Sequence, residues 1–384
     1  MSIDSEIKRH KHILVCGDNT NSLNILRSLG EKEIRPIVIM QEEGHLSLLA
    51  KSKYIGEIIS VCGFENAVTK LLEFADVSCP PFVYLTDDNH LQVIDDNYNN
   101  LKDKFYFFNA GSQGRLTQYL DKEQQCWLAE KHGLSVPKYE EVDRGQLPTK
   151  LTYPIITKTN NSYSPGWKRD VTICYSPQEL SDAYRRMVSE RLLLQEYIEK
   201  TGEYSMQGIS INGGESVYLP FERMYLRYTK KSFGGYMYYQ PFEDKELHEK
   251  VQAMLREIGF TGCFEIEFLV DKKQQLHFLE INLRFSASNY GVNTGGVNLP
   301  YLWAQSTLLN TIDTHNLNPR NQRYYVINDT TDIDAAKKVG YITWLKQYIS
   351  ADGYYLWNLH DKKPYFSWWT QRIGRKIAKV LHVK

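Results

Sequence analysis

The sequence lacks several features that would each point to a defined class of protein. Its 46 basic and 46 acidic residues give a formal net charge of zero, which argues against the basic surface that bulk nucleic-acid binding requires. No apolar run approaches the roughly 18 residues of a membrane span. The N-terminal stretch MSIDSEIKRHKH has no apolar segment of signal-peptide length. We therefore expect a cytoplasmic protein that does not bind nucleic acid.

Paired cysteines and a dinucleotide fingerprint are absent too. The six cysteines are scattered and none forms a C-x-x-C pair, which argues against a zinc site or a disulfide framework and favours reduced thiols. The first turn of the chain, GDNTNS, lacks the G-x-G-x-x-G spacing of dinucleotide-binding proteins. A nicotinamide-dependent oxidoreductase is therefore disfavoured.

Apolar runs and helical segments alternate over the first part of the chain, which predicts a parallel α/β domain. A helix with a terminal glycine is expected at 22–30, and strands are expected at 12–18, 35–40, 82–88 and 106–109. Asp87 and Asp88 end one of these strands, where ligands bind in such sheets, although helix capping is the simpler explanation. The stretch 120–139 is expected to be a helix that stops at Gly133, followed by a turn into Pro137. Further elements are expected at 153–158 (strand), near 177–190 (helix), at 192–198, 204–211 and 215–224 (strands), and at about 244–258 (helix).

A predicted hairpin, FEIEFLVDKKQQLHFLEINLRF at 264–285, carries unusually many polar groups. A loop at 273–274 or at 272–275 places Glu267 opposite Glu280, and the period of two puts one set of side chains on a single face: Glu267, Glu280, Asn282 and Arg284. The residues that anchor the opposite face are expected among Phe268, Phe278, Leu279, Ile281 and Leu283. Carboxylate and amide oxygens suit Mg²⁺. A salt-bridge network in a solvated groove is the alternative.

Two lysines stand where they would lie over this face. Lys122 opens the helix that stops at Gly133, and Lys158 ends the strand at 153–158. Lysine is a common point-charge partner of phosphate groups. The polar loop that follows, TNNSYSPGWKRD, contains a single glycine, Gly166.

The order of these motifs resembles the ATP-grasp superfamily over roughly residues 12 to 310. The resemblance is carried by DK…LAE..G..VP around Lys122, the strand ending in Lys158, the hinge QEYI, the acid in TGEYSM and the E-x-N-x-R string. It implies that Lys122 and Lys158 bind phosphates, that the backbone of Glu196, Tyr197 and Ile198 holds adenine, and that Glu203 binds ribose. It also implies one or two Mg²⁺ ions, with Mn²⁺ as an alternative, on Glu267, Glu280 and Asn282, and catalytic roles for Lys158 and Arg284.

The resemblance implies an α/β and α+β chain: an ATP-grasp fold preceded by a Rossmann-like domain. The expected parts are an N-terminal domain at 1–115, an ATP-grasp domain at 116–311 with a lid at about 150–200, and a Trp-rich C-terminal segment at 312–384. The implied activity is an ATP-dependent ligase that joins a small-molecule carboxylate to an amine through an acyl phosphate. The glycine-poor loop after Lys158 keeps an ATP-binding protein with weak or no turnover open as the alternative.

Within the superfamily, the chain resembles predicted carboxylate:amine ligases and D-aspartate ligases. Two segments carry this likeness, ERMYLRYTKKSFGG at 222–235 and NLHDKKPYFSWW near 358–369. Arg223, Arg227 and Lys231 are candidates for binding an anionic substrate, and a solvated basic strand face is the equal alternative.

The C-terminal stretch QRIGRKIAKVLHVK predicts a basic amphipathic helix. Its apolar stripe comprises Ile373, Ile377, Val380 and Leu381, with Arg372, Arg375, Lys376 and Lys379 on the other faces. Such a helix makes weak contact with an anionic membrane surface, or it docks on the body of the protein, which is the preferred interpretation. A homodimer is left open.

Overall fold

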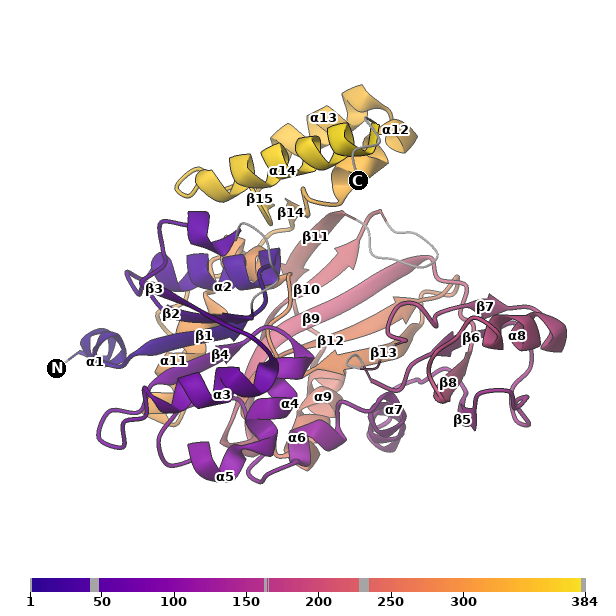
Figure 1. Ribbon diagram of the computed structural model, residues 1–384, viewed down its shortest axis with the longest axis horizontal. Coiled ribbons are helices and arrows are strands. Elements are labelled where there is room, and N and C mark those ends of the chain that lie inside the picture. Colours follow the sequence, from indigo (N-terminus) through magenta and orange to yellow (C-terminus); the bar gives the residue numbers. More distant parts are fainter. Residues whose placement is uncertain (1, 42–47, 162–163, 165, 228–234, 381–384) are drawn as a thin grey trace.

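A computed structural model describes residues 2–41, 48–161, 164, 166–227 and 235–380. In this part of the chain the strands form three sheets, which Figure 1 shows side by side, with the C-terminal helices above them. The chain is thus a mixed α/β protein, as the sequence predicted. No helix among the described residues is long and apolar enough to cross a membrane.

The N-terminal sheet is parallel, with the order β3-β2-β1-β4. Its strands are β1 (His12–Cys16), β2 (Ile37–Gln41), β3 (Glu57–Val61) and β4 (Phe82–Leu85). Every residue of β1 is buried, as expected where helices cover both faces of a parallel sheet. The accompanying helices are α1 (Ile3–Arg9), α2 (Thr20–Gly30), α3 (Phe64–Leu72), α4 (Asp88–Asp96), α5 (Tyr98–Leu101) and α6 (Arg115–Gln118).

The sequence predicted this parallel domain correctly, but it missed one strand and predicted another where the structure has only a single bridge. Strand β3 was not predicted, because Glu57 and Ser60 are polar and exposed and only one of its five residues, Val61, is buried. The strand expected at 106–109 is reduced to a single parallel bridge between Tyr106 and Phe82.

A small antiparallel sheet follows, with the order β5-β8-β6-β7. Its elements are α7 (Lys122–Lys131), β5 (Tyr139–Asp143), β6 (Ile155–Lys158), β7 (Ile173–Cys174), α8 (Pro177–Tyr184) and β8 (Arg191–Glu196). It has a separate hydrophobic core made by residues between 142 and 194. Asp121 caps α7 by accepting a hydrogen bond from the Gln124 N–H, which fixes Lys122 in the first turn of that helix.

The large sheet has the order β13-β12-β9-β10-β11-β14-β15. Its strands are β9 (Gly202–Ile211), β10 (Ser216–Tyr225), β11 (Tyr236–Pro241), β12 (Gly262–Val270), β13 (Leu276–Asn282), β14 (Tyr324–Ile327) and β15 (Gly353–Tyr354). Its helices are α9 (Lys245–Ile258), α10 (Asn289–Thr294) and α11 (Leu299–Leu309). The middle elements expected from the sequence are all present, with ends shifted by a few residues.

Helix α11 contacts both α2 of the N-terminal domain and β9 of the large sheet. Its Trp303 is fully buried and meets Phe82, Tyr84 and Phe108 edge to face. One hydrophobic core therefore runs through the N-terminal and large sheets. The division at 115/116 and 311/312 stays a prediction.

The C-terminal segment adds α12 (Ala336–Val339), α13 (Tyr341–Ser350) and α14 (Lys363–Val380) above the sheets (Figure 1). It is joined to the N-terminal domain by a buried ion pair. Arg27 of α2 donates from Nε to Asp361 Oδ2 at 3.0 Å and from Nη2 to the Asp361 carbonyl at 3.0 Å. The same carboxylate accepts hydrogen bonds from Ser52 Oγ and the Lys53 N–H.

Candidate functional site

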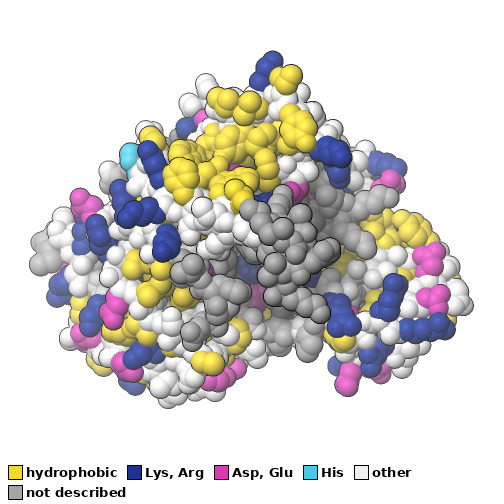
Figure 2. Space-filling view, turned by 45° about the horizontal axis from the view of Figure 1, so that its top comes forward, with side chains coloured by type: hydrophobic (Ala, Val, Ile, Leu, Met, Phe, Trp, Pro, Cys, Tyr) yellow, Lys and Arg dark blue, Asp and Glu magenta, His cyan; other side chains and the backbone are white. Residues whose placement is uncertain are grey.

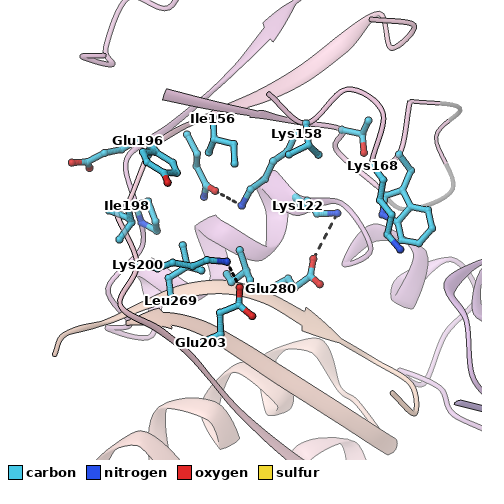
Figure 3. A pocket seen from close by; sticks show the side chains of 17 residues that line it. Lys122, Ile156, Lys158, Lys168, Glu196, Ile198, Lys200, Glu203, Leu269 and Glu280 are labelled. Carbon is cyan, nitrogen blue, oxygen red and sulfur yellow. Dashed lines mark hydrogen bonds and ion pairs between the residues drawn. The ribbon is translucent and has the colours of Figure 1, made fainter. Parts of the chain in front are cut away.

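A cavity of about 220 Å³ lies between the small sheet and the β12–β13 edge of the large sheet (Figure 3). Both sheets supply its walls, and α7 supplies one more side chain. It is lined by Lys122, Pro137, Ile156, Lys158, Thr159, Trp167, Lys168, Val171, Gln195, Glu196, Tyr197, Ile198, Lys200, Glu203, Leu269, Leu279 and Glu280. All six residues that the sequence assigned to ATP line this one cavity.

Two lysines enter the cavity from different elements. In β6, Ile156 and Lys158 point into it, while the alternating Thr157 is buried on the other side. Lys158 Nζ donates to Gln195 Oε1 at 2.6 Å, and burial lowers the pKa of Lys158 to about 8. Lys122 Nζ lies 3.8 Å from Glu280 Oε2. Both cations are thus held in place, with Lys158 largely desolvated and poised to bind an anion.

The hinge after β8 offers a backbone donor. The N–H of Glu196 bonds the Lys138 carbonyl, and the N–H of Tyr197 bonds the Pro154 carbonyl. The N–H of Ile198 donates no hydrogen bond to a residue that the structure describes. Among the three residues predicted to hold adenine, Ile198 is therefore the one whose backbone N–H is available to bind it.

Glu203, at the start of β9, is buried and ion-paired with Lys200. Burial raises the pKa of Glu203, and the neighbouring Lys200 opposes this rise. Its Oε2 atom is buried and has no hydrogen-bond partner in the described part of the chain. An unsatisfied buried acceptor is costly, and a hydroxyl of a bound sugar would satisfy it.

The hairpin pairs Glu267 with Glu280, as predicted, although its turn and strand register differ from those expected. The turn spans 271–275, which is longer than either expected loop, at 273–274 or at 272–275, so Phe268 faces Phe278. Leu279 is an extra, bulged residue in β13, and this bulge restores the predicted pairing of Glu267 with Glu280. Because of this bulge, Leu279 lines the cavity beside Glu280. Of the set expected to include the anchors of the opposite face, Phe278 and Ile281 are buried, whereas Leu279 lines the cavity.

The facing carboxylates form the part of the site that fits a divalent cation. Asn282 Nδ2 donates to Glu267 Oε1 at 3.2 Å, so the three predicted metal ligands gather on one face. Burial and the nearby carboxylates of Glu265 and Glu280 raise the pKa of Glu267 well above its usual range. A cation relieves this repulsion. No group of three His, Cys, Asp or Glu side chains suited to a metal occurs among the described residues, and the third oxygen here is an amide.

Arg284 lies in a smaller adjoining cavity of about 40 Å³, which shares Lys122, Trp167 and Glu280 with the first. Its Nη2 donates to Asn282 Oδ1 at 3.1 Å, and its Nε donates to Asp88 Oδ1 at 2.7 Å. Asp87 caps α4 through the His90 N–H. The capping interpretation thus holds for Asp87, while Asp88 orients the arginine.

Arg223 stands in line with the paired acids across the large sheet. The register runs Arg223↔Ser205↔Glu267↔Glu280 over β10, β9, β12 and β13. With strands about 4.8 Å apart, its Cα lies roughly 10 Å from that of Glu267. Arg223 is buried and pairs with Glu265 Oε1 at 3.1 Å, and its Nε has no partner among the described residues.

The other two predicted substrate residues are not brought to this row. Arg227 makes a bidentate ion pair with Asp332, at 2.8 and 2.6 Å, and donates to Gln347 Oε1 at 2.5 Å. Lys231 lies outside the described residues.

Several lining residues were missed by sequence reasoning. Leu269 shares the face of Glu267 through the alternation of β12, which could have revealed it. Gln195, Lys200 and Trp167 carried no signal, because their roles depend on contacts between separate elements. Trp167 is 46% exposed at the rim, with Lys168 Nζ 4.1 Å from its ring centroid.

Comparisons with known proteins relate parts of this chain to other proteins. Residues 189–331 match a family described as ATP-grasp in the biosynthetic pathway with Ter operon. N5-carboxyaminoimidazole ribonucleotide synthase of Staphylococcus epidermidis is 24% identical over 132 residues, which are 34% of this chain and 34% of that protein. The match thus spans about a third of the length of that curated relative.

Solved structures resemble the chain over a larger part of its length. L-amino acid ligase from Bacillus licheniformis aligns with a TM-score of 0.61 at 16% identity, covering 82% of this chain and 79% of that one. N5-carboxyaminoimidazole synthetase from Staphylococcus aureus, complexed with ADP, aligns with a TM-score of 0.66 at 14% identity, covering 86% and 85%. At these identities the likeness establishes the fold.

Proposed function

We propose that this chain, which belongs to the ATP-grasp superfamily, is an ATP-dependent ligase that joins a carboxylate to an amine and releases ADP and phosphate. The observation that carries the proposal is the continuous polar row on one face of the large sheet. The row runs from Glu280 through Glu267 and Ser205 to Arg223. Lys158 of the small sheet and Lys122 of α7 enter the cavity beside its Glu280 end. A nucleotide phosphate chain and an anionic substrate would meet along this row.

The nucleotide would occupy the larger cavity, with adenine against Ile156, Leu269 and Leu279 and its edge on the Ile198 N–H. Its ribose hydroxyls would donate to Glu203. The α- and β-phosphates would lie on Lys122 and Lys158. Glu267, Glu280 and Asn282 would hold Mg²⁺, which would offset the negative charge of the phosphates.

The reaction has two steps. A carboxylate oxygen of the acid attacks the γ-phosphorus, the bond to ADP breaks, and an acyl phosphate forms. The amine nitrogen then attacks the acyl carbon, the carbon–oxygen bond to phosphate breaks, and an amide forms as the amine loses a proton to solvent. Catalysis rests on positioning and charge neutralisation.

Two arginines would serve the acid and its activated form. Arg284, oriented by Asp88, lies beside Asn282 and would offset charge on the transferred phosphoryl group. Arg223 would bind an acidic group of the substrate through its unpartnered Nε. Arg227 is given no part, because Asp332 and Gln347 already occupy its guanidinium group.

An ADP-release assay in Mg-ATP, with pools of amino acids and hydroxy acids as acids and amines, tests the proposal. We expect ADP release that needs both an acid and an amine, with amide product detected by mass spectrometry. ADP release that needs bicarbonate in place of a second organic substrate would instead indicate a carboxylase. Nucleotide binding without ADP release under any pool would favour the alternative without turnover, which the single glycine of the loop after Lys158 supports.

A further inference from the structure

Helix α13 presents an apolar side to solvent. Tyr341, Ile342, Leu345 and Ile349 are 69%, 75%, 50% and 72% exposed, and no residue of the helix is buried. Ile342, Leu345 and Ile349 follow the i, i+3, i+7 spacing of one helical stripe, which a helix of a globular protein normally buries. Figure 2 shows hydrophobic side chains gathered at the top of the molecule, where the C-terminal helices lie. We call these four residues the α13 face.

The helix is held to the protein by its other side. Trp344 Nε1 donates to Asp332 Oδ2 at 2.8 Å, and Gln347 accepts a hydrogen bond from Arg227. The Tyr348 hydroxyl interacts with that of Tyr365 in α14. Because specific hydrogen bonds fix the polar side inward, the outward direction of the apolar side is built into the fold. Exposed apolar groups that cluster in this way mark interaction sites.

The surroundings of the α13 face are basic. Residues 332–374 contain six Lys or Arg and four acids. All four acids are engaged in ion pairs: Asp332 with Arg227, Asp334 with Arg372, Asp352 with Arg320 and Asp361 with Arg27. The exposed lysines form no ion pair with a described residue, and they are Lys337, Lys338, Lys346, Lys362 and Lys363. This excess is local, since the whole chain is neutral.

We propose that the α13 face, together with Phe366 and Ile373 of α14, docks on an anionic membrane surface. Phe366 and Ile373 are 58% and 51% exposed. An aliphatic and aromatic stripe beside unpaired lysines complements the acyl–headgroup boundary of anionic lipid. A second copy of the chain fits less well, because a two-fold contact would bring the same lysines face to face. This inference does not depend on the proposed ligase activity.

Helix α14 is a smaller contributor than the sequence suggested. Arg372 donates to the Thr330 carbonyl and to Asp334, so this part of the helix is docked on the protein. The side chains of the predicted stripe beyond residue 374, namely Ile377, Val380 and Leu381, lie outside the described side chains. The better-defined apolar surface belongs to α13, which the sequence had not singled out.

Co-sedimentation of the full-length protein with vesicles tests the proposal. One set contains equal parts phosphatidylglycerol and phosphatidylcholine, and the other contains phosphatidylcholine alone. We expect binding to the anionic set at about 0.05 M salt and release at about 0.5 M salt, where charges are screened within a few ångströms. Ile342→Ser/Leu345→Ser/Ile349→Ser should lower the bound-to-free ratio at least about tenfold.

A second variant separates charge from apolar contact. Each lysine near an anionic surface is worth roughly a fivefold change in binding, so Lys337→Gln/Lys338→Gln/Lys346→Gln should lower the ratio about a hundredfold. The matched control is Val77→Ser/Leu147→Ser, which removes apolar side chains 72% and 47% exposed elsewhere and should bind as the unaltered protein does.

Three outcomes would overturn the inference. The first is no binding of the unaltered protein to anionic vesicles at low salt. The second is equal binding by the triple serine variant, which would place the contact elsewhere. The third is a concentration-dependent dimer in light scattering that the serine variant abolishes, without vesicle binding, which would assign the α13 face to a second copy.

Discussion

Replacing Glu280 by glutamine removes one of the two carboxylates that face each other across β12 and β13. We expect the fold to tolerate this change. The Glu280 side chain is 27% exposed, and its ion pair with Lys122 is long, at 3.8 Å. Loss of such a pair costs less than about 1 kcal/mol. Removing the repulsion between the two directly opposed carboxylates stabilises the fold by a similar free energy. The free energy of unfolding should therefore change by less than about 1 kcal/mol, and Tm by no more than about 3 °C.

Activity should respond very differently. Glu280 is a proposed Mg²⁺ ligand, and a neutral amide in its place offers one weaker oxygen. We expect kcat/KM for ADP release to fall at least about a hundredfold. The assay is ADP release in Mg-ATP with the responding substrate pair, alongside thermal unfolding of the same samples.

Glu257→Gln is the matched control for this prediction. Glu257 is 24% exposed and pairs with Lys131 at 2.6 Å, outside the cavity. It should keep full activity. Turnover by Glu280→Gln at the unaltered rate would refute the metal assignment. A Tm lowered by more than about 10 °C would refute the balance of charges argued above.

Three further predictions concern the nucleotide. Glu203→Ala should raise KM for ATP more than it lowers kcat in steady-state assays, since ribose contacts are nearly equal in the ground and transition states; equal effects on both would contradict the ribose role. Because Lys158 loses its proton near pH 8 in the free protein, the affinity for ADP should be constant below about pH 7 and weaken up to about tenfold per pH unit above pH 8. Titration calorimetry between these limits measures this, and Lys158→Met should bind weakly with no such slope. Trypsin should cleave after the exposed Lys168 and Arg169 more slowly when Mg-ATP is added, because Trp167 and Lys168 line the cavity; equal rates would remove this segment from the site.

The sequence could predict which side chains share a face, but not how the chain brings them there. In the hairpin, the alternation correctly grouped Glu267, Glu280 and Asn282. The five-residue turn and the bulge at Leu279 could not be foreseen, because they compensate each other in the pairing. The alternation fits a two-residue loop and a four-residue loop equally well, and it gives no sign of the five-residue turn that the structure has.

Other features depended on strand order or on tertiary docking. Arg223 in β10 reaches Glu265 in β12 because the two strands flank β9 in the large sheet, a strand order that the sequence does not reveal. In α13, the spacing of Ile342, Leu345 and Ile349 is that of a buried stripe. The exposure of these residues in the structure, with the hydrogen bonds of Trp344 and Gln347 on the other side of the helix, shows that the stripe points outward.

The ion pair between Arg27 and Asp361 joins a residue that is translated early to one that is translated near the end of synthesis. Its two residues are 334 positions apart, an interval of roughly 20 to 70 seconds of translation. Until Asp361 has been made, Arg27 has no counter-charge from the C-terminal segment, and this segment cannot yet cover the Arg27 side of α2. The first domain to leave the ribosome is therefore among the last to be completed. Ribosome-bound chains that stop before residue 361 should leave Arg27 accessible to solvent.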